Sequence, residues 1–165
     1  MTARAAALLA ITAVVACAMR ASAVPHGGPA PVVVAPSTSR AATVLADVVA
    51  TLEARNRGLG GRAALPPDGG MLFVYDFDTP APRTYWMKDC LIALDIAFIG
   101  PDRRILNVAT LPAGAGLPEP QIARADSRGP ASWVLETGAG WFARHGLGAG
   151  DEVDLSAALP GVVPR

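Results

Sequence analysis

The alternation of apolar and polar positions divides this chain into short segments that favour strands over long helices. We expect strands at residues 43–50, 71–75, 83–88, 92–99, 104–110, 132–136 and 152–155. A short helix is expected at residues 52–57, with Thr51 as its N-cap and Gly58 after its last turn, and another from Thr137 to His145. About seven strands and two short helices indicate an α+β, mainly β fold, built as a compact barrel-like structure or a sandwich.

The clearest supersecondary unit is a hairpin formed by residues 92–99 and 104–110. The four residues between them, Gly100-Pro101-Asp102-Arg103, place proline at the second position of a tight turn. Because the fixed φ of proline suits that position, the two strands are expected to pair with each other.

The first 23 residues have the features of an export signal. Arg4 supplies a positive charge, residues 5–18 are apolar apart from one threonine, and Ala21-Ser22-Ala23 offers a cleavage site after Ala23. A transmembrane anchor is one alternative, although about 14 apolar residues fall short of the roughly 20 that span a bilayer. A second alternative is a lipoprotein, since Val14-Val15-Ala16-Cys17 resembles a lipobox in which Cys17 is lipidated. We expect an extracytoplasmic protein, periplasmic or secreted, with a lipid-anchored form through Cys17 as the alternative.

The rest of the chain is expected to form one domain. Residues 24–41 are rich in proline and glycine, which predicts a poorly packed tether that holds at most a short edge strand at Val32-Val33-Val34. Residues 42–158 are expected to fold as a single β-rich domain, and residues 159–165 to be a frayed tail.

The charge balance of the residues after Ala23 limits the classes of partner that this protein is expected to bind. The remaining 142 residues (165 − 23) carry 12 basic and 14 acidic side chains, a net charge of 12 − 14 = −2. A near-neutral balance argues against a nucleic-acid partner, which favours a basic surface. The two histidines and Cys90 form no zinc-binding pattern, so we expect neither a metal nor a cofactor. Cys90 is expected to be a buried small hydrophobe.

The segment Tyr85-Trp86-Met87-Lys88-Asp89-Cys90 holds the first candidate chemistry. Lys88 is the only lysine of a chain with 13 arginines, and strand alternation places Trp86 and Lys88 on one face. An aromatic ring beside a cation is a common recognition surface. The alternative is structural: Trp86 belongs to the core and Lys88 extends its stem over it.

Asp95 is the second candidate, because it interrupts the apolar run from residue 91 to residue 99. Alternation places it between Ala93 and Ala97, opposite the face of Leu94 and Ile96. Burying an unpaired carboxylate is costly, so Asp95 must be solvated, paired or protonated. Either it has a structural role, in an ion pair or as a cap of backbone N–H groups, or it binds a ligand in a shallow groove.

Taken in order, the motifs of this chain resemble a known family. They are Arg57-Gly58-Leu59, Gly70-Met71-Leu72-Phe73-Val74, Tyr85-Trp86-Met87-Lys88-Asp89, Leu94-Asp95-Ile96-Ala97-Phe98, and residues 130–136 and 139–151. The order resembles the bacterial and archaeal family called domain of unknown function 192 over about residues 43–155. The resemblance implies a small exported domain with a compact β-rich fold, and it brings no established activity.

The chain departs from the usual pattern of that family at several positions. Asp89-Cys90 stands where the family usually has Asn-Thr, Ala93 where a proline usually precedes Leu-Asp, and Gly60 where a methionine usually follows Arg-Gly-Leu. The change from Asn to Asp adds a negative charge beside Lys88.

Two functional hypotheses follow. The first is a non-enzymatic binding or accessory domain of the cell envelope that uses Trp86, Lys88, Asp89 and Asp95 to bind a small molecule, a glycan or an envelope protein. It rests on the lack of a complete catalytic set and on the aromatic and charged face. The alternative is a hydrolase or transferase in which Asp89 and Asp95 act as an acid/base pair. A purely structural domain is a third reading.

Overall fold

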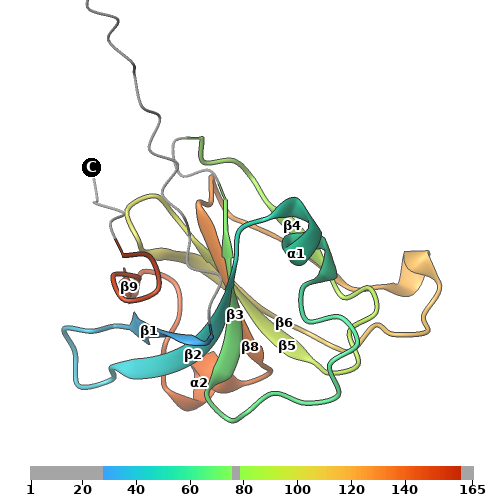
Figure 1. The fold of residues 1–165 in the computed structure, drawn as a ribbon, viewed down its shortest axis with the longest axis horizontal. Helices are drawn as coiled ribbons and strands as arrows, with labels where there is room; N and C mark the ends of the chain where they lie inside the picture. Colours follow the sequence, from blue (N-terminus) through green and yellow to red (C-terminus); the bar gives the residue numbers. More distant parts are fainter. Residues whose placement is uncertain (1–27, 76–78, 161–165) are drawn as a thin grey trace, which may run out of the picture.

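The computed structural model describes residues 28–75 and 79–160, so the expected signal sequence, Ala23 and Cys17 lie outside the described residues (Figure 1). The strands are β1 Ala30–Val34, β2 Ala42–Val49, β3 Gly69–Val74, β4 Thr84–Trp86, β5 Leu94–Ile99, β6 Ile105–Leu111, β7 Arg124–Asp126, β8 Trp133–Gly138 and β9 Val153–Asp154. The helices are α1 Leu52–Arg57, a 3-10 helix Glu119–Gln121, and α2 Trp141–Arg144. Within the described ranges, each helix is too short to cross a bilayer.

Seven strands form one curled sheet in the order β6-β5-β8-β3-β2-β1-β9, and β4 pairs with β7 in a separate ribbon. All neighbours are antiparallel except β2 and β3, which are parallel and are connected through α1. The curl brings β9 back to the start of β6, where Val153 N–H donates to the Arg103 carbonyl (2.8 Å) and Ile105 N–H donates to the Asp151 carbonyl (3.0 Å). The mainly β, barrel-like fold with two short α-helices is therefore confirmed.

Each face of the curled sheet covers its own hydrophobic core. The α2-side core gathers side chains of β1, β2, β9 and α2 together with one face of β3, β5 and β8, and includes Val34, Leu72, Ala97, Leu135 and Trp141. The β4-side core lies between the opposite face and the β4–β7 ribbon, and includes Phe73, Tyr85, Met87, Ile96, Phe98 and Val134. Because side chains alternate along β3, β5 and β8, each of these strands contributes to both cores.

Helix α1 and the β5–β6 hairpin form where the sequence predicts them. The Thr51 hydroxyl accepts a hydrogen bond from Ala54 N–H (3.2 Å), and Gly58 takes a positive φ of 50° directly after the last turn. In the hairpin, Gly100 N–H donates to the Arg104 carbonyl at 2.9 Å. These elements depend on neighbours in the sequence, which is why pattern and turn chemistry locate them.

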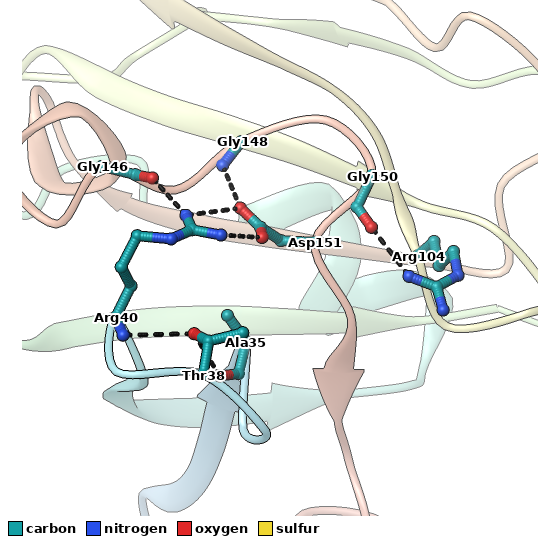
Figure 2. A network of polar contacts seen from close by, with 8 residues as sticks. All are labelled: Ala35, Thr38, Arg40, Arg104, Gly146, Gly148, Gly150 and Asp151. Atoms are coloured by element: carbon teal, nitrogen blue, oxygen red, sulfur yellow. Dashed lines mark hydrogen bonds and ion pairs between the residues drawn. The ribbon is translucent and has the colours of Figure 1, made fainter.

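The segment expected to be a tether differs most from its prediction. Its described part begins at residue 28 and contains β1, which lies between β2 and β9, so it is not at the edge of the sheet. Val32 and Val34 are fully buried. Figure 2 shows a further anchor: Arg40, in the turn after β1, contacts the Asp151 carboxylate at 2.7 Å and also donates to the Gly146 carbonyl. This ion pair lowers the pKa of Asp151. Strand pairing with distant segments thus outweighs the local effect of proline and glycine.

Two smaller predictions also need correction. The second helix begins at Trp141, because Thr137 continues β8 and is paired in the ladder opposite Asp95 of β5. The chain end is packed further than expected, since Leu159 is 3% exposed within the α2-side core. Gly146, just after α2, has a positive φ of 63°, the conformation that glycine commonly takes after the last turn of a helix.

Candidate functional site

An open cleft of about 990 Å³ lies between α1 with its following loop and β4 with its following turn. Residues 52–61 form one wall and residues 83–90 form the other. Strands β3 and β8 contribute Phe73, Tyr75 and Glu136. The volume lies at the upper end of the range of small-molecule sites. Of the four predicted binding residues, Trp86, Lys88 and Asp89 line this cleft.

Glu136 is the most unusual group in the cleft. It lies on β8, whose neighbours Met71 of β3 and Ile96 of β5 are apolar, and its side chain is on the face of the β4-side core. Glu136 is only 6% exposed, and no described residue forms a hydrogen bond or ion pair with its carboxyl group. Burial raises its pKa to about 8. At neutral pH the group is therefore mostly a neutral carboxylic acid.

A pair of tyrosines lies near this acid. The hydroxyl oxygens of Tyr75 and Tyr85 are 2.8 Å apart and share a hydrogen bond. The ring of Tyr85 packs edge-on against Phe73 and Phe98, with centroids 5.1 and 5.7 Å away. Burial, followed by the proximity of Tyr75, raises the pKa of Tyr85, so its hydroxyl stays protonated. The pair is a neutral polar feature in an otherwise aromatic wall.

Two arginines contact the ring of Tyr75: Arg55 of α1 and Arg83, the residue before β4. The guanidinium carbon of Arg83 lies 3.8 Å from the centroid of that ring, and that of Arg55 lies 4.8 Å from it. Arg55 also donates to the Val74 carbonyl at 2.9 Å, and Arg83 Nε donates to the Ala131 carbonyl at 3.4 Å. Both are positioned by backbone carbonyls and an aromatic face. Within the described ranges, neither guanidinium has a carboxylate partner.

Trp86 and Lys88 lie together, as strand alternation predicts. The Lys88 ammonium is 5.3 Å from the Trp86 ring centroid, and Arg124 of β7 is 4.7 Å from it. Trp86 is 40% exposed, so the alternative in which it is a core residue is not what the structure shows. Two cations already contact its ring, which makes this rim cationic as well as aromatic.

Asp89 forms the turn that follows Lys88. Its φ is 59°, and its carbonyl accepts a hydrogen bond from Gly61 N–H (2.9 Å) in the opposite wall. Asn and Asp tolerate this left-handed conformation better than other residues with a Cβ. The Asp that stands in place of the usual Asn of the family can therefore form the same turn. Asp89 also borders a smaller hollow of about 160 Å³ next to Gly114 and Leu117.

Asp95 does not belong to the cleft. It is 1% exposed and points to the opposite face of the sheet, where one carboxylate oxygen accepts from the Thr110 hydroxyl (2.6 Å) and the other from Phe142 N–H of α2 (3.1 Å). This is the structural, backbone-capping role that the sequence left open. Asp89 and Asp95 lie on different sides of the sheet, so the geometry gives no support to an acid/base pair formed by them.

Cys90 is buried beside the cleft, with 7% of its surface exposed. Burial, followed by the charges of Glu136 and Asp89, raises the pKa of its thiol to about 11. A thiol with this pKa is a poor nucleophile at neutral pH. In the part of the chain that the structure describes, no three His, Cys, Asp or Glu side chains are grouped in a way that could hold a metal ion.

Sequence reasoning missed Glu136. It ends the predicted strand at residues 132–136, and alternation along that strand pairs it with Val134 on one face. A single carboxylate in an apolar run is the same signal that drew attention to Asp95. Because the predicted strand ends at Glu136, the pattern does not place this side chain inside the sheet. Strand β8 continues to Gly138, so Glu136 lies within the strand.

One family was found when this chain was compared with known proteins. The sequence profile of the domain of unknown function 192 family, described as Uncharacterized ACR, matches residues 33–155. A crystal structure of a protein of unknown function from Novosphingobium aromaticivorans DSM 12444 is 31% identical, with a TM-score of 0.64 over 75% of this chain and 83% of that chain. A Sinorhizobium meliloti 1021 protein described as a proposed transcription regulator is 30% identical, with a TM-score of 0.65 over 79% of this chain and 97% of that chain. No curated protein matches. The matched region runs from β1 to the residue after β9, and this chain therefore belongs to the domain of unknown function 192 family.

Proposed function

We propose that this protein is an exported, non-enzymatic domain that binds a small molecule in the cleft between α1 and β4. The observation that carries the proposal is the carboxyl group of Glu136, which is buried, faces the cleft and has no partner among the described residues. Among the described residues, the fully buried side-chain atoms without a partner are Ser132 Oγ and Trp133 Nε1, so the carboxyl group of Glu136 is still reachable from the cleft. A ligand in the cleft can therefore supply the hydrogen-bond partner that this group lacks.

The chemistry of the cleft supports binding more than catalysis. Its aromatic and cationic side chains are typical of recognition surfaces. The groups that a catalytic site would use are separated or inactive: Asp89 and Asp95 face different sides of the sheet, and the Cys90 thiol has a raised pKa. A nucleophile needs a base bonded to it or a lowered pKa; the Cys90 thiol has a raised pKa, and no described residue forms a hydrogen bond with it.

Binding in this cleft is tested by a thermal-shift screen of small anions, neutral molecules and cations, with envelope glycans among the neutral compounds. The screen compares the wild type with Trp86→Ala and Lys88→Ala. Arg128→Ala is the matched control, because Arg128 is an exposed cation that does not line the cleft. We expect at least one compound to raise the Tm of the wild type and the control, and to raise it less in the two cleft variants. If no compound gives a shift that depends on Trp86 or Lys88, the binding proposal fails.

Export is supported by the leader sequence. If cleavage follows Ala23, six residues precede β1; if Cys17 is lipidated, residues 18–29 connect the lipid to β1. Twelve extended residues reach at most about 40 Å, so an anchored form would hold the domain close to the membrane.

The mature N-terminus distinguishes the two forms of export. Mass spectrometry of protein from the envelope and medium fractions should find a chain that begins at Val24. A diacylated or triacylated chain that begins at Cys17 would establish the lipoprotein instead. An intact leader on protein that stays in the cytoplasm would refute export.

A further inference from the structure

We infer that the ligand of this cleft is an organic anion, whose charge is balanced by Arg55, Arg83 and Lys88 and whose acid group accepts a hydrogen bond from Glu136. This inference rests on the proposed binding function and adds the chemical class of the ligand. Three independent features of the cleft lead to it: the balance of charge around it, the state of the Trp86 ring and the environment of Glu136.

The charge around the cleft is the first feature. Four cations line it, and one of them, Arg57, is paired with Glu53 at 2.8 Å. Among the described residues, Arg55, Arg83 and Lys88 have no carboxylate partner. Against them stands Asp89, because Glu136 is mostly neutral at pH 7. Among the described residues that line the cleft, the unpaired groups therefore sum to a charge of 3 − 1 = +2, which attracts anions and raises their local concentration.

The state of the Trp86 ring is the second feature. Carbohydrate sites often use the free face of an aromatic ring, but the Trp86 ring is already contacted by Lys88 and Arg124 at 5.3 and 4.7 Å. A sugar that stacks on a face covered by one of these cations would have to displace it. An anion can contact the same cations without moving them from the ring. This arrangement favours an anionic ligand over a neutral glycan.

The environment of Glu136 is the third feature. Its neighbours in the sheet, Met71 and Ile96, carry no charge, and Tyr85 and Cys90, which line the same cleft, are close enough for its charge to raise their pKa values. Burial alone keeps this acid protonated. A neutral carboxylic acid has one O–H donor, and the acceptor that gains most from it is a charged oxygen.

The other groups near the floor leave that donor available. Tyr75 and Tyr85 already share one hydrogen bond with each other. The cations Arg55 and Arg83 lie at the Tyr75 ring and do not pair with Glu136. A ligand that contacts both the Glu136 carboxyl group and the cations must extend from one to the other. It is therefore a molecule several bonds long and not a monoatomic ion. Deprotonation of Glu136 would replace a donor by a like charge and would weaken binding.

The test uses three probes of the same shape: isophthalate, a dianion; isophthalamide, its neutral counterpart; and isophthalamidine, whose amidinium groups make it a dication at both pH values. Their binding to the mature protein is measured by isothermal titration calorimetry at pH 7 and pH 9. We expect isophthalate to bind best at pH 7. If only protein with protonated Glu136 binds it, the Kd rises about 10-fold between pH 7 and pH 9, since the pKa is about 8.

Two substitutions isolate the role of Glu136. Glu136→Gln keeps an N–H donor and cannot ionise, so it should bind isophthalate with little change between the two pH values. Glu136→Leu removes the donor and should bind weakly at both. Circular dichroism of each variant confirms that it is folded. Lys88→Gln should weaken isophthalate binding at both pH values, and Arg128→Gln should not.

The outcomes separate this inference from the binding function itself. Tighter binding of isophthalamidine at pH 9 would identify Glu136 as a carboxylate that binds cations and would overturn the inference. Equal binding of isophthalamide and isophthalate would overturn the selectivity for anions. Both results would leave a functional binding cleft. If isophthalate does not bind at either pH, the inference is overturned, and the broader screen then decides whether the binding function stands.

Discussion

Asp95 and Glu136 are two buried carboxyl groups on neighbouring strands of one sheet, and their surroundings differ. On the α2 side, Asp95 accepts hydrogen bonds from Thr110 and from the backbone of Phe142, so both of its oxygens have partners. On the β4 side, Glu136 has no partner among the described residues, and the space in front of it is an open cleft. One face of the sheet is closed by a helix whose first turn Asp95 binds. The other face is left open between α1 and β4.

The difference shows how burial alone fails to distinguish a structural acid from a binding acid. Asp95 attracts attention in the sequence, but its hydrogen bonds make it part of the framework. Glu136 costs stability, because burial without a partner disfavours its charged form and forces the folded state to hold a proton. Such a cost at a cleft is consistent with a group kept for binding. Each of the following predictions compares the two sides of the sheet.

The largest effect is expected in the pH dependence of stability. The pKa of Glu136 is about 8 in the folded chain against an ordinary value of 4.5, so the folded state holds a proton that the unfolded state releases between these values. The free energy of unfolding should therefore fall as pH rises from 4.5 to 8, by about 5 kcal/mol in total at 1.36 kcal/mol per pKa unit. Urea unfolding of the wild type and Glu136→Gln at pH 5, 6.5 and 8 measures this difference.

Glu152→Gln provides the control for that experiment, because Glu152 is exposed. Its unfolding free energy should follow the wild type at each pH. Parallel pH profiles for the wild type and Glu136→Gln would show that Glu136 is ionised in the folded protein at ordinary pH, and the contrast between the two sides would be lost.

On the closed side, Asp95→Ala should lower the free energy of unfolding by about 2 to 3 kcal/mol. The substitution removes two hydrogen bonds to a charged acceptor and leaves Phe142 N–H buried without a partner. Asp95→Asn retains one acceptor oxygen and should lose less. Urea unfolding at pH 7 measures both, and an Asp95→Ala variant as stable as the wild type would contradict the framework role.

The Cys90 thiol reports on the open side. With a pKa of about 11 against an ordinary 9.0, its thiolate population at pH 8 is about 100-fold lower than that of a free cysteine. Labelling by a maleimide or by a disulfide reagent should therefore be at least about 100-fold slower in the folded protein than in urea, in a Cys17→Ser background. Glu136→Gln should react faster, since the charge of Glu136 contributes to the shift. Equal rates in the folded and unfolded protein would show an exposed thiol.

The smallest effect is expected at Asp89, in the turn that follows β4 and lines the cleft. Asp89→Ala should cost about 1 kcal/mol, because alanine is strained at a φ of 59°. Asp89→Asn should change stability by only a few tenths of this value. Thermal unfolding measures both. If the two variants are equally destabilised, the Asp89 carboxylate and not its backbone conformation supports the turn.

Local patterns located the local elements. The bounds of α1, its Thr51 cap and the β5–β6 hairpin depend on contacts within a few residues, and these were predicted. Trp86 and Lys88 were placed together because they are two residues apart in an extended segment. Strand β1 was predicted at most as a short edge strand, and its place inside the sheet was missed, because its stability comes from β2 and β9, and β9 lies over a hundred residues away.

For the site itself, the sequence determined which residues of one strand share a face, since alternation follows from backbone geometry. It therefore showed that Asp95 opposes Leu94 and Ile96. It could not show which face of β5 meets α2 and which meets β4, because that depends on how the sheet curls and where the connections return. The tertiary structure decided this. It assigned Asp95 to the closed side and Glu136, with Trp86, Lys88 and Asp89, to the open cleft.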